Sequence, residues 1–444
     1  MDLLRGLITP LVKDKFGDLS LSSNYRPVMS SSVLLKLFEY CLLSKIDPYI
    51  ELNDRQHGFR KKHSTSTACY CLKETVMYYM NANSDVHACF IDISKAFDSV
   101  NHDILIDKLY KVGIPGCLVK LIEHWYNNQF VRVKYGSSVS NEWKISNGVR
   151  QGGVLSGLFF SIYINSLIEK VSKLNTGCML GILRSNIIAY ADDIVLMAPS
   201  AKSLQTLINV AYSEGVDLDL SFNHSKTKAM VFCSHKHNVK TQLMKSFIVG
   251  NCPIQFVTSI RYLGYSISSD LNETEDISRV RNKFYAEFNS VLRKFSFTDK
   301  KVKLFLFKQY CLQFYGSELW CAKGTKLQVI KQFAVGYHNA IKRLLGLSSH
   351  ESTHYACQEA NLLMFNHMLN KIRIRAALRF LLKPCNFIQN IAGFLRVSSV
   401  LVCDVREILL KEYEVDSLFD NDFEAICARI WFVQNHETQM RESW

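Results

Sequence analysis

The sequence has no uninterrupted apolar run of 18 residues, although 48% of its 444 residues are hydrophobic. A transmembrane helix needs about 20 consecutive apolar residues, so we expect no membrane span and no membrane partner. The first five residues (MDLLR) also lack the charged-then-apolar layout of a secretory signal peptide. These two absences argue against an integral membrane protein and against secretion.

No C-x-x-C pair occurs among the 14 cysteines, which are scattered along the chain. Such pairs are typical of zinc sites and of redox dithiols, so no zinc knuckle is expected. Scattered thiols indicate a reducing intracellular setting, cytosolic or nuclear, rather than a disulfide-stabilised protein. The sequence also lacks internal repeats and low-complexity tracts.

The chain does carry an excess of positive charge, +13 at neutral pH. Neutralisation of phosphates supplies most of the non-specific affinity of proteins for nucleic acids, so a polyanionic partner is compatible with this composition. Charge alone is a poor argument, because many soluble proteins are basic. The length is sufficient for two or three domains with sizeable cores.

Two adjacent carboxylates, Asp192 and Asp193, are flanked on both sides by apolar residues in the segment 187–197 (IIAYADDIVLM). Two short apolar runs that are broken only by acids predict a buried hairpin with the acids at its turn. Burying paired carboxylates is costly unless a cation neutralises them, and hard divalent metals commonly do so. Taken alone, the pair is weak evidence, because most such pairs are solvated turn residues.

A second apolar segment that ends on an acid, residues 86–92 (VHACFID), lies 100 residues earlier, measured from Asp92 to Asp192. Residues so far apart can meet only as neighbours in one sheet, and we predict that arrangement. One carboxylate from one strand and a pair from the next could hold two metal ions about 3.5–4 Å apart, as phosphoryl transfer requires.

Between the two acidic segments lies a glycine-rich loop, residues 147–153 (NGVRQGG), and an apolar run follows from Ser156. Glycines let the backbone approach a flat ligand closely, and the apolar run is long enough for a buried helix. A loop of this kind is weak evidence for any one ligand. Its position between the two acidic strands gives it weight.

These segments belong to an ordered series of motifs. In chain order they are NYRP at 24–27, QHGFR at 56–60, FIDxxxAFD at 90–98, GVRQG at 148–152, AYADD at 189–193, NxSKT at 223–227 and YLG at 262–264. The series resembles that of reverse transcriptases, in particular the non-LTR (LINE, jockey-like) retrotransposon branch. The resemblance covers about residues 8–267.

The chain departs from the family pattern at two places. Gly157 stands where the family usually has proline, and Met1 lies partway into the expected fingers region. We therefore expect a fingers subdomain that is truncated at its N-terminus.

The resemblance implies a catalytic centre with a defined metal requirement. Asp92, Asp192 and Asp193 correspond to the catalytic carboxylates and metal ligands, and the backbone carbonyl of Ile93 would be a further ligand. Lys226 corresponds to a lysine near the leaving pyrophosphate; otherwise it is one of many surface lysines. The implied cofactor is a pair of Mg²⁺ ions, for which Mn²⁺ could substitute.

The resemblance also implies contacts to nucleotide and primer. Arginine suits bidentate phosphate recognition and lysine supplies a point charge. The implied nucleotide-binding residues are Lys13, Arg26 and Arg60 at the triphosphate, Phe97 beneath the sugar, where its ring excludes a 2′-hydroxyl, and Gln151 and Gly152 at the nucleotide and template base. The turn Tyr262-Leu263-Gly264 resembles the primer grip. Without the motif, Phe97 would be read as a core aromatic.

The apolar spacing along the chain alternates between helical and strand periods. It predicts helices at 31–50, 64–82 and 201–213, hairpins at 130–146 and around Gly250-Asn251, and a strand near 229–233. This alternation predicts an α+β fold. The resemblance implies the right-hand polymerase type, with fingers at 1–85, palm at 86–267, a helical thumb at 268–349 and a helical C-terminal extension of unknown role at 350–444.

Residues 277–295 place apolar side chains at helical spacing and leave basic ones on other faces. This pattern predicts an amphipathic basic helix that suits a thumb lying on a phosphate backbone. The alternative is a core helix with an ordinary solvated face. Further helices are expected at 300–315 and at 325–345, the latter ending before Gly346.

Two short motifs resemble metal sites. Residues 350–354 spell H-E-x-x-H, the zinc-protease signature, but the preceding serines place the start of a helix there, and we interpret the match as chance. Cys233, His235 and His237 follow a predicted strand, and we interpret them as a polar loop.

The combined prediction is an RNA-directed DNA polymerase of a LINE-type element. Its expected partners are an RNA template, such as the element's own RNA, a DNA primer and dNTPs. The alternatives are a truncated, non-catalytic nucleic-acid-binding relic, and a reverse transcriptase of the group II intron maturase type. Because NYRP begins 23 residues after Met1 and residues 350–444 show no second acidic cluster, we expect neither an endonuclease nor an RNase H domain.

Overall fold

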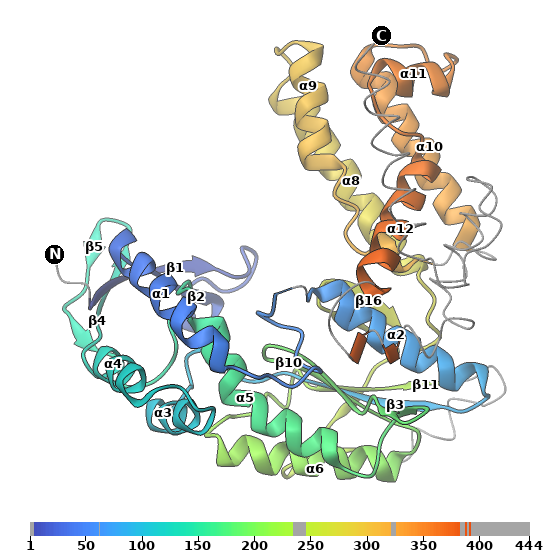
Figure 1. The fold of residues 1–444 in the computed structure, drawn as a ribbon. Helices are drawn as coiled ribbons and strands as arrows, with labels where there is room; N and C mark the ends of the chain where they lie inside the picture. The colour runs from blue at the N-terminus through green and yellow to red at the C-terminus, as the bar shows by residue number, and fades with distance from the viewer. Residues whose placement is uncertain are drawn as a thin grey trace. The chain divides into compact units, whose positions relative to one another are not determined.

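The computed structural model describes residues 4–61, 63–233, 246–320, 326–381, 387–388 and 390–391. The chain divides into two compact units, residues 1–258 and 259–444 (Figure 1). We call them the N-terminal and C-terminal units and describe each by itself. No described helix has the length and apolarity needed to cross a membrane.

One of the two five-stranded sheets described in the N-terminal unit holds both acidic segments. Its strands, in spatial order, are β14 (Gln255–Phe256), β11 (Lys228–Phe232), β3 (Val86–Ile91), β10 (Asp193–Ala198) and β9 (Ile187–Tyr190). Strand β10 runs antiparallel to β3, with Ile194 opposite Ile91, and β9 and β10 form a hairpin. The predictions of a hairpin at Asp192 and of neighbouring strands for Asp92 and Asp192 are therefore confirmed.

Helices cover both faces of this sheet. Helices α5 (Ser156–Lys173) and α6 (Ala201–Asp217) pack side by side, and α2 (Thr65–Asn81) lies on the opposite face (Figure 1). Burial on both faces explains why β3 and β10 are almost continuously buried and mostly apolar, rather than alternating. The helix predicted after Ser156 is confirmed, as are those predicted at 64–82 and 201–213.

A second sheet in the same unit carries the N-terminal motifs. Its strands are β2 (Tyr25–Ser30), β1 (Arg5–Val12), β4 (Phe130–Tyr135) and β5 (Ser138–Val139), and β6 (Trp143–Lys144) also pairs with β4. The hairpin predicted at 130–146 is thus confirmed. The remaining helices of this part are α1 (Val33–Ile46), α3 (His102–Lys111) and α4 (Gly116–Asn127).

Helix α1 is shorter than the predicted span of 31–50. Its first turn is capped by Ser32, whose side chain accepts from the backbone N–H of Leu35. It ends at Ile46 and continues as the 3₁₀ turn Asp47–Tyr49, because Pro48 cannot supply the N–H that another helical turn needs. Short hairpins complete the unit: β7 (Met179–Leu180) with β8 (Leu183–Arg184), and β12 (Ile248–Val249) with β13 (Cys252–Pro253), as predicted around Gly250.

The C-terminal unit begins with a hairpin and continues as helices. The hairpin is β15 (Ser259–Tyr262) and β16 (Tyr265–Ser268). The helical elements are α8 (Thr274–Lys294), α9 (Lys300–Leu306), a π-helical turn (Phe307–Cys311), a 3₁₀ turn (Ser317–Leu319), α10 (Lys326–Leu345), α11 (Thr353–Glu359) and α12 (Phe365–Leu381). With the two sheets, this content confirms the α+β class.

Helix α8 is amphipathic, as its spacing predicted. Ile277, Val280, Phe284 and Phe288 are buried in the core of the unit, where Phe284 contacts several aromatic rings, among them Phe333. Helix α10 ends before Gly346, which adopts φ +70°.

The H-E-x-x-H match does not place two histidines on one helix. Helix α11 begins at Thr353 with Ser352 as its cap, so His350 and Glu351 precede the helix and only His354 lies in it. Cys233 follows β11, whereas His235 and His237 lie outside the described residues.

Candidate active site

The acidic hairpin turns through only two residues. Tyr190, at the end of β9, pairs with Asp193, at the start of β10, so Ala191 and Asp192 form the loop. Ala191 adopts φ +56°, a conformation that two-residue hairpin loops require and that glycine usually supplies. An alanine held there costs about 1–2 kcal/mol. Something outside the hairpin must therefore hold this turn.

Gln56 supplies that restraint. Its side-chain oxygen Oε1 accepts the backbone N–H of Ala191 at 3.0 Å and that of Gly58 at 2.9 Å. The same segment bonds to the hairpin on either side of Gln56, since His57 N donates to Ala189 O (2.7 Å) and Ala189 N donates to Arg55 O (2.9 Å). Gln56 is fully buried, with 0% of its surface exposed.

Gly58 makes this close approach possible. A Cβ atom at Gly58 would lie 2.4 Å from the backbone nitrogen of Ala191, closer than any real contact. The motif QHGFR thus holds the acidic hairpin through Gln56 and Gly58. From the sequence, only Arg60 of this motif was predicted to have a role. The roles of Gln56 and Gly58 were missed, although both residues stand in the same motif.

Arg60 is occupied within its own loop. Its guanidinium lies 3.2 Å from the Asp54 carboxylate and donates to the carbonyl of Asn53 at 3.0 Å. These contacts brace the segment that carries Gln56. The contact of Arg60 with a triphosphate remains a prediction.

The backbone of Asp92 is held by the loop 223–227. Asn223 N donates to the carbonyl oxygen of Asp92 (2.8 Å), and Asp92 N donates to the hydroxyl of Thr227 (3.3 Å). This anchoring brings Lys226 beside the acid, with Nζ 3.7 Å from Asp92 Oδ2. The structure therefore brings together Asp92 and Lys226, two of the predicted catalytic residues.

Asp193 belongs to the same end of the sheet. Because Ile194 pairs with Ile91 across antiparallel strands, the next position along each strand places Asp193 opposite Asp92. Burial, together with the neighbouring Asp192 and Asp92 carboxylates, raises the pKa of Asp193 to about 6 against the attraction of Lys226. Burial also raises the pKa of Asp192. The site therefore holds more negative charge than Lys226 neutralises.

The donor set suits a hard divalent cation. Within the described ranges, no group of three or more His, Cys, Asp or Glu side chains is arranged to hold a metal ion. Mg²⁺, however, is usually held by one or two carboxylates together with water and substrate phosphates. A pair of aspartates at the end of the sheet is sufficient for that chemistry, so the absence of a three-residue cluster does not oppose it.

Ile93 extends the sheet past the acid. Its side chain is buried, and it forms an isolated antiparallel bridge with Phe222. The next residue, Ser94, donates its N–H to Ser221 O at 2.8 Å. This pairing fixes the backbone around Ile93, the predicted carbonyl ligand.

The glycine-rich loop packs against the segment that follows Asp92. Val149 N donates to Phe97 O and Gly148 N to Val100 O, both at 2.7 Å. The side chain of Gln151 donates to Asp98 Oδ1, also at 2.7 Å. A Cβ atom at Gly148 would lie 2.9 Å from the carbonyl oxygen of Asp98, so this contact needs glycine. Gly152 adopts φ +105°, which also favours glycine.

Two buried charged residues brace this loop from behind, and the sequence did not single them out. The guanidinium of Arg150 lies over the Trp125 ring, 5.0 Å from its centroid, and donates to Gln129 at 2.9 Å. The Glu39 carboxylate accepts the N–H of Val154 at 2.8 Å. Burial lowers the pKa of Arg150 and raises the pKa of Glu39. Both residues therefore have a structural role.

Phe97 stands in an aromatic stack. Its ring stacks on Phe160 with centroids 4.9 Å apart and meets the edge of Phe59 at 5.8 Å. The departure at Gly157 has a reason here: a Cβ atom at Gly157 would lie 2.2 Å from the Phe59 ring. A proline at 157 would displace Phe59. The glycine therefore leaves the space that the Phe59 ring occupies beside Phe97.

Arg26 lies on β2 of the second sheet, and Lys13 directly follows β1. Leu11 is the cross-strand partner of Arg26, and Lys13 N bonds to Asn24 O. Direct partners share a face and alternate residues share a face, so Lys13 and Arg26 point to the same side of the β1–β2 ribbon. Both are exposed, and Lys13 Nζ donates to Ser23 O at 2.8 Å.

The predicted primer-grip residues form a second two-residue turn, in the C-terminal unit. Tyr262 pairs with Tyr265, and Leu263 and Gly264 adopt φ +46° and +85°. Positive φ at both central positions is the type I′ geometry that matches the twist of hairpins. The structure thus confirms a tight turn at this position, while its contact with a primer remains a prediction.

Comparisons with known proteins agree with the motif series. The chain matches the family model described as "Reverse transcriptase (RNA-dependent DNA polymerase)" over residues 13–267, more than half of its length. It is 27% identical over 274 residues to the Retrovirus-related Pol polyprotein from type-1 retrotransposable element R2 of Nasonia vitripennis, a match that covers 58% of this chain and 26% of that protein.

A second relative comes from the predicted branch. The chain is 23% identical over 317 residues to the RNA-directed DNA polymerase from mobile element jockey of Drosophila funebris, covering 66% of this chain and 33% of that protein. The matches thus span about a quarter to a third of these relatives. Among solved structures, apo telomerase from Candida tropicalis is similar at a TM-score of 0.45 and 12% identity, over 93% of this chain and 68% of that chain, which is too weak a likeness to support a conclusion.

Proposed function

Because this chain belongs to the reverse transcriptase (RNA-dependent DNA polymerase) family, we propose that it extends a DNA primer by copying an RNA template, with dNTPs as substrates. The observation that carries the proposal is the meeting of Asp92, Asp193 and Lys226 at one end of adjacent strands, next to the turn that holds Asp192. The matched relatives include retroelement proteins, and we propose that this chain is the polymerase of a LINE-type mobile element.

The site would work with two divalent ions, for which we propose Mg²⁺. Asp92 and Asp192 would be the shared ligands, with Asp193 and the carbonyl oxygen of Ile93 beside them. Bound there, the ions would neutralise phosphate charge and favour ionisation of the primer 3′-hydroxyl. An all-oxygen donor set also accepts Mn²⁺.

The protein residues would orient the reactants. Lys226 supplies a positive charge near the leaving pyrophosphate. Phe97, whose ring contacts Phe160 and Phe59, would exclude a 2′-hydroxyl. Gln151 and Gly152 would face the incoming nucleotide and the template base. We propose that Lys13 and Arg26, which share one face of their ribbon, hold the triphosphate, with Arg60 in a secondary role.

The same proposal assigns parts of the chain to a right-hand polymerase. Residues 1–85 would act as fingers, 86–267 as palm and 268–349 as thumb, while the role of 350–444 remains undefined. The N-terminal unit ends at Thr258, ahead of the primer-grip hairpin. The hairpin β15–β16 therefore belongs structurally with the helices that follow it.

Primer extension on an RNA template tests the function. We expect the purified chain to extend an annealed DNA primer with dNTPs and Mg²⁺, and we expect Asp192→Asn to abolish extension while nucleic-acid affinity stays nearly intact. The metal ligand acts in the transition state, whereas affinity depends on many phosphate contacts. The matched control is Asp217→Asn, because Asp217 is an exposed aspartate at the end of α6.

Extension by Asp192→Asn at a rate near that of the wild type would exclude this site. A wild-type chain that binds primer–template with no extension in Mg²⁺ or Mn²⁺ would favour the non-catalytic relic.

A further inference from the structure

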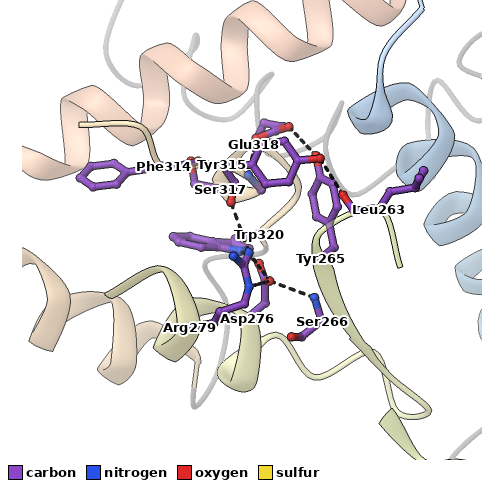
Figure 2. Close-up of polar contacts among 11 residues, drawn as sticks. Leu263, Tyr265, Ser266, Asp276, Arg279, Phe314, Tyr315, Ser317, Glu318 and Trp320 are labelled. Atoms are coloured by element: carbon purple, nitrogen blue, oxygen red, sulfur yellow. Dashed lines mark hydrogen bonds and ion pairs between the residues drawn. The ribbon is translucent and has the colours of Figure 1, made fainter. Parts of the chain in front are cut away.

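The Leu263-Gly264 turn is hydrogen-bonded to Tyr315, a residue distant in the sequence. The hydroxyl of Tyr315 donates a hydrogen bond to the carbonyl oxygen of Leu263 at 2.7 Å (Figure 2). The position of a Cβ atom at Gly264 lies 3.0 Å from the Tyr315 ring, so the ring rests on the turn where only glycine leaves room. Tyr315 also contacts the Tyr265 ring, with centroids 5.0 Å apart.

Tyr315 is itself fixed by a buried carboxylate on α8. Asp276, which is 3% exposed, accepts the N–H of Ser266 on β16 at 3.0 Å and the indole N–H of Trp320 at 2.8 Å. It also forms an ion pair with Arg279 at 2.7 Å. Arg279 in turn donates to the carbonyl oxygen of Tyr315 at 3.4 Å. One buried charge therefore links the hairpin, α8 and the Tyr315 segment.

Glu318 makes a second link between the same parts. It accepts the hydroxyl of Tyr265 at 2.9 Å and the N–H of Gly316 at 3.2 Å (Figure 2). Gly316 adopts φ +102°, and a Cβ atom there would lie 3.1 Å from Asp276. The segment that carries Tyr315 is thus bound on both sides of the tyrosine.

Exposure separates Tyr315 from the rest of this network. Asp276 and Glu318 are buried, so breaking their contacts would destabilise the unit. Tyr315 keeps 40% of its surface exposed, and its hydroxyl donates to the carbonyl oxygen of the turn. The hydroxyl therefore contacts the turn from a partly exposed side chain, whereas Asp276 and Glu318 bond inside the unit.

We propose that Tyr315 is a positioning residue for the primer terminus. Its hydroxyl fixes the Leu263–Gly264 peptide, and the fixed turn presents its backbone to the terminal nucleotide of the primer. Asp276 and Glu318 hold Tyr315 for this task. The inference rests on the proposed function, in which residues 262–264 are the primer grip.

The test replaces Tyr315 with phenylalanine, which removes the hydroxyl and keeps the ring. A seated, matched terminus gains from a fixed turn, whereas a mismatched terminus does not seat and gains little. We expect the ratio of matched to mismatched extension rates in single turnovers to fall roughly fivefold, the equivalent of one ordinary hydrogen bond. The ratio does not depend on the fraction of active protein, so partial unfolding alone leaves it unchanged.

Tyr310→Phe is the matched control, because Tyr310 is 60% exposed and lies five residues away in the same unit. Hydrogen exchange of the 259–268 peptide gives a readout without catalysis, and we expect faster exchange in Tyr315→Phe only. A wild-type chain that extends no primer would overturn the proposed function and this role with it. If the wild type is active and both Tyr315→Phe and Tyr310→Phe keep its ratio of matched to mismatched extension rates, the inference alone is overturned.

Discussion

The turn at Ala191-Asp192 and the turn at Leu263-Gly264 each join two antiparallel strands through two residues, and each begins with a non-glycine residue at positive φ, +56° and +46°. A distant side chain holds each of them by one hydrogen bond. Gln56 accepts the N–H of Ala191, and Tyr315 donates to the carbonyl of Leu263. The difference lies in burial, since Gln56 is fully buried and Tyr315 is 40% exposed.

Burial decides how much freedom each turn has. A buried N–H that loses its acceptor keeps the full desolvation penalty, whereas a carbonyl near solvent can bond to water instead. The turn at Ala191-Asp192 is therefore fixed at one geometry, as the proposed metal ligands would require. The turn at Leu263-Gly264 is held more weakly and can adjust, which would suit the proposed contact with a primer that moves after each addition.

Replacement of Gln56 by methionine gives the largest effect that this comparison predicts. The change keeps the volume and removes the acceptor for the N–H groups of Gly58 and Ala191. Two orphaned buried donors should cost about 2–4 kcal/mol of stability. Misplacement of the acids by about 1 Å should lower the single-turnover rate about 100-fold. Rapid-quench extension and calorimetric unfolding measure the two quantities.

Leu204→Ala is the control for that experiment. Leu204 is fully buried on α6, and its truncation should cost a similar 2–5 kcal/mol with the rate per active site unchanged. If Gln56→Met loses stability to the same extent and retains its rate, burial of the holding residue does not control the catalytic turn.

The sequence predicted the catalytic sheet better than the contacts that hold it. Strand periodicity and the 100-residue spacing placed Asp92 beside the acidic hairpin, because apolar runs and register are local properties of each strand. The acceptor role of Gln56 depends on a bridge between segments more than 130 residues apart in sequence, and no local pattern reports such a bridge.

The C-terminal unit shows the same limit more strongly. The apolar spacing of α8 predicted its buried face, yet Asp276 lies within that helix as an unremarkable acid. Its partners Ser266 and Trp320 come from other elements. The helix predicted at 300–315 ends at Cys311, and Tyr315 lies in the irregular segment that follows. Only the folded chain shows that its hydroxyl reaches Leu263.

The next expected effect in size concerns sugar selection, which the proposed function assigns to Phe97 in the N-terminal unit. Phe97→Val removes the ring that Phe160 and Phe59 hold in place. A contact of this kind discriminates by roughly 10- to 100-fold, and we expect the preference for dNTP over rNTP to fall by that factor. Competitive single-nucleotide incorporation measures the preference. Tyr315→Phe should leave it unchanged, and an unaltered preference in Phe97→Val would identify Phe97 as a core aromatic only.

Glycine substitution at the two strained positions gives the smallest effect and compares the turns directly. Relief of a left-handed conformation gains about 1–2 kcal/mol, and the greater freedom of an unfolded glycine offsets about 0.5–1 kcal/mol of that gain. Ala191→Gly and Leu263→Gly should therefore each change stability by about 1 kcal/mol or less in calorimetric unfolding.

Their effects on catalysis should differ, because Gln56 still fixes Ala191 from a buried position, whereas Leu263 is held by the partly exposed hydroxyl of Tyr315. We expect Ala191→Gly to retain the single-turnover rate and Leu263→Gly to lower it about two- to threefold on matched termini, a fraction of one hydrogen bond. Equal losses in both variants, or a loss confined to Ala191→Gly, would show that burial of the holding side chain does not set the freedom of these turns.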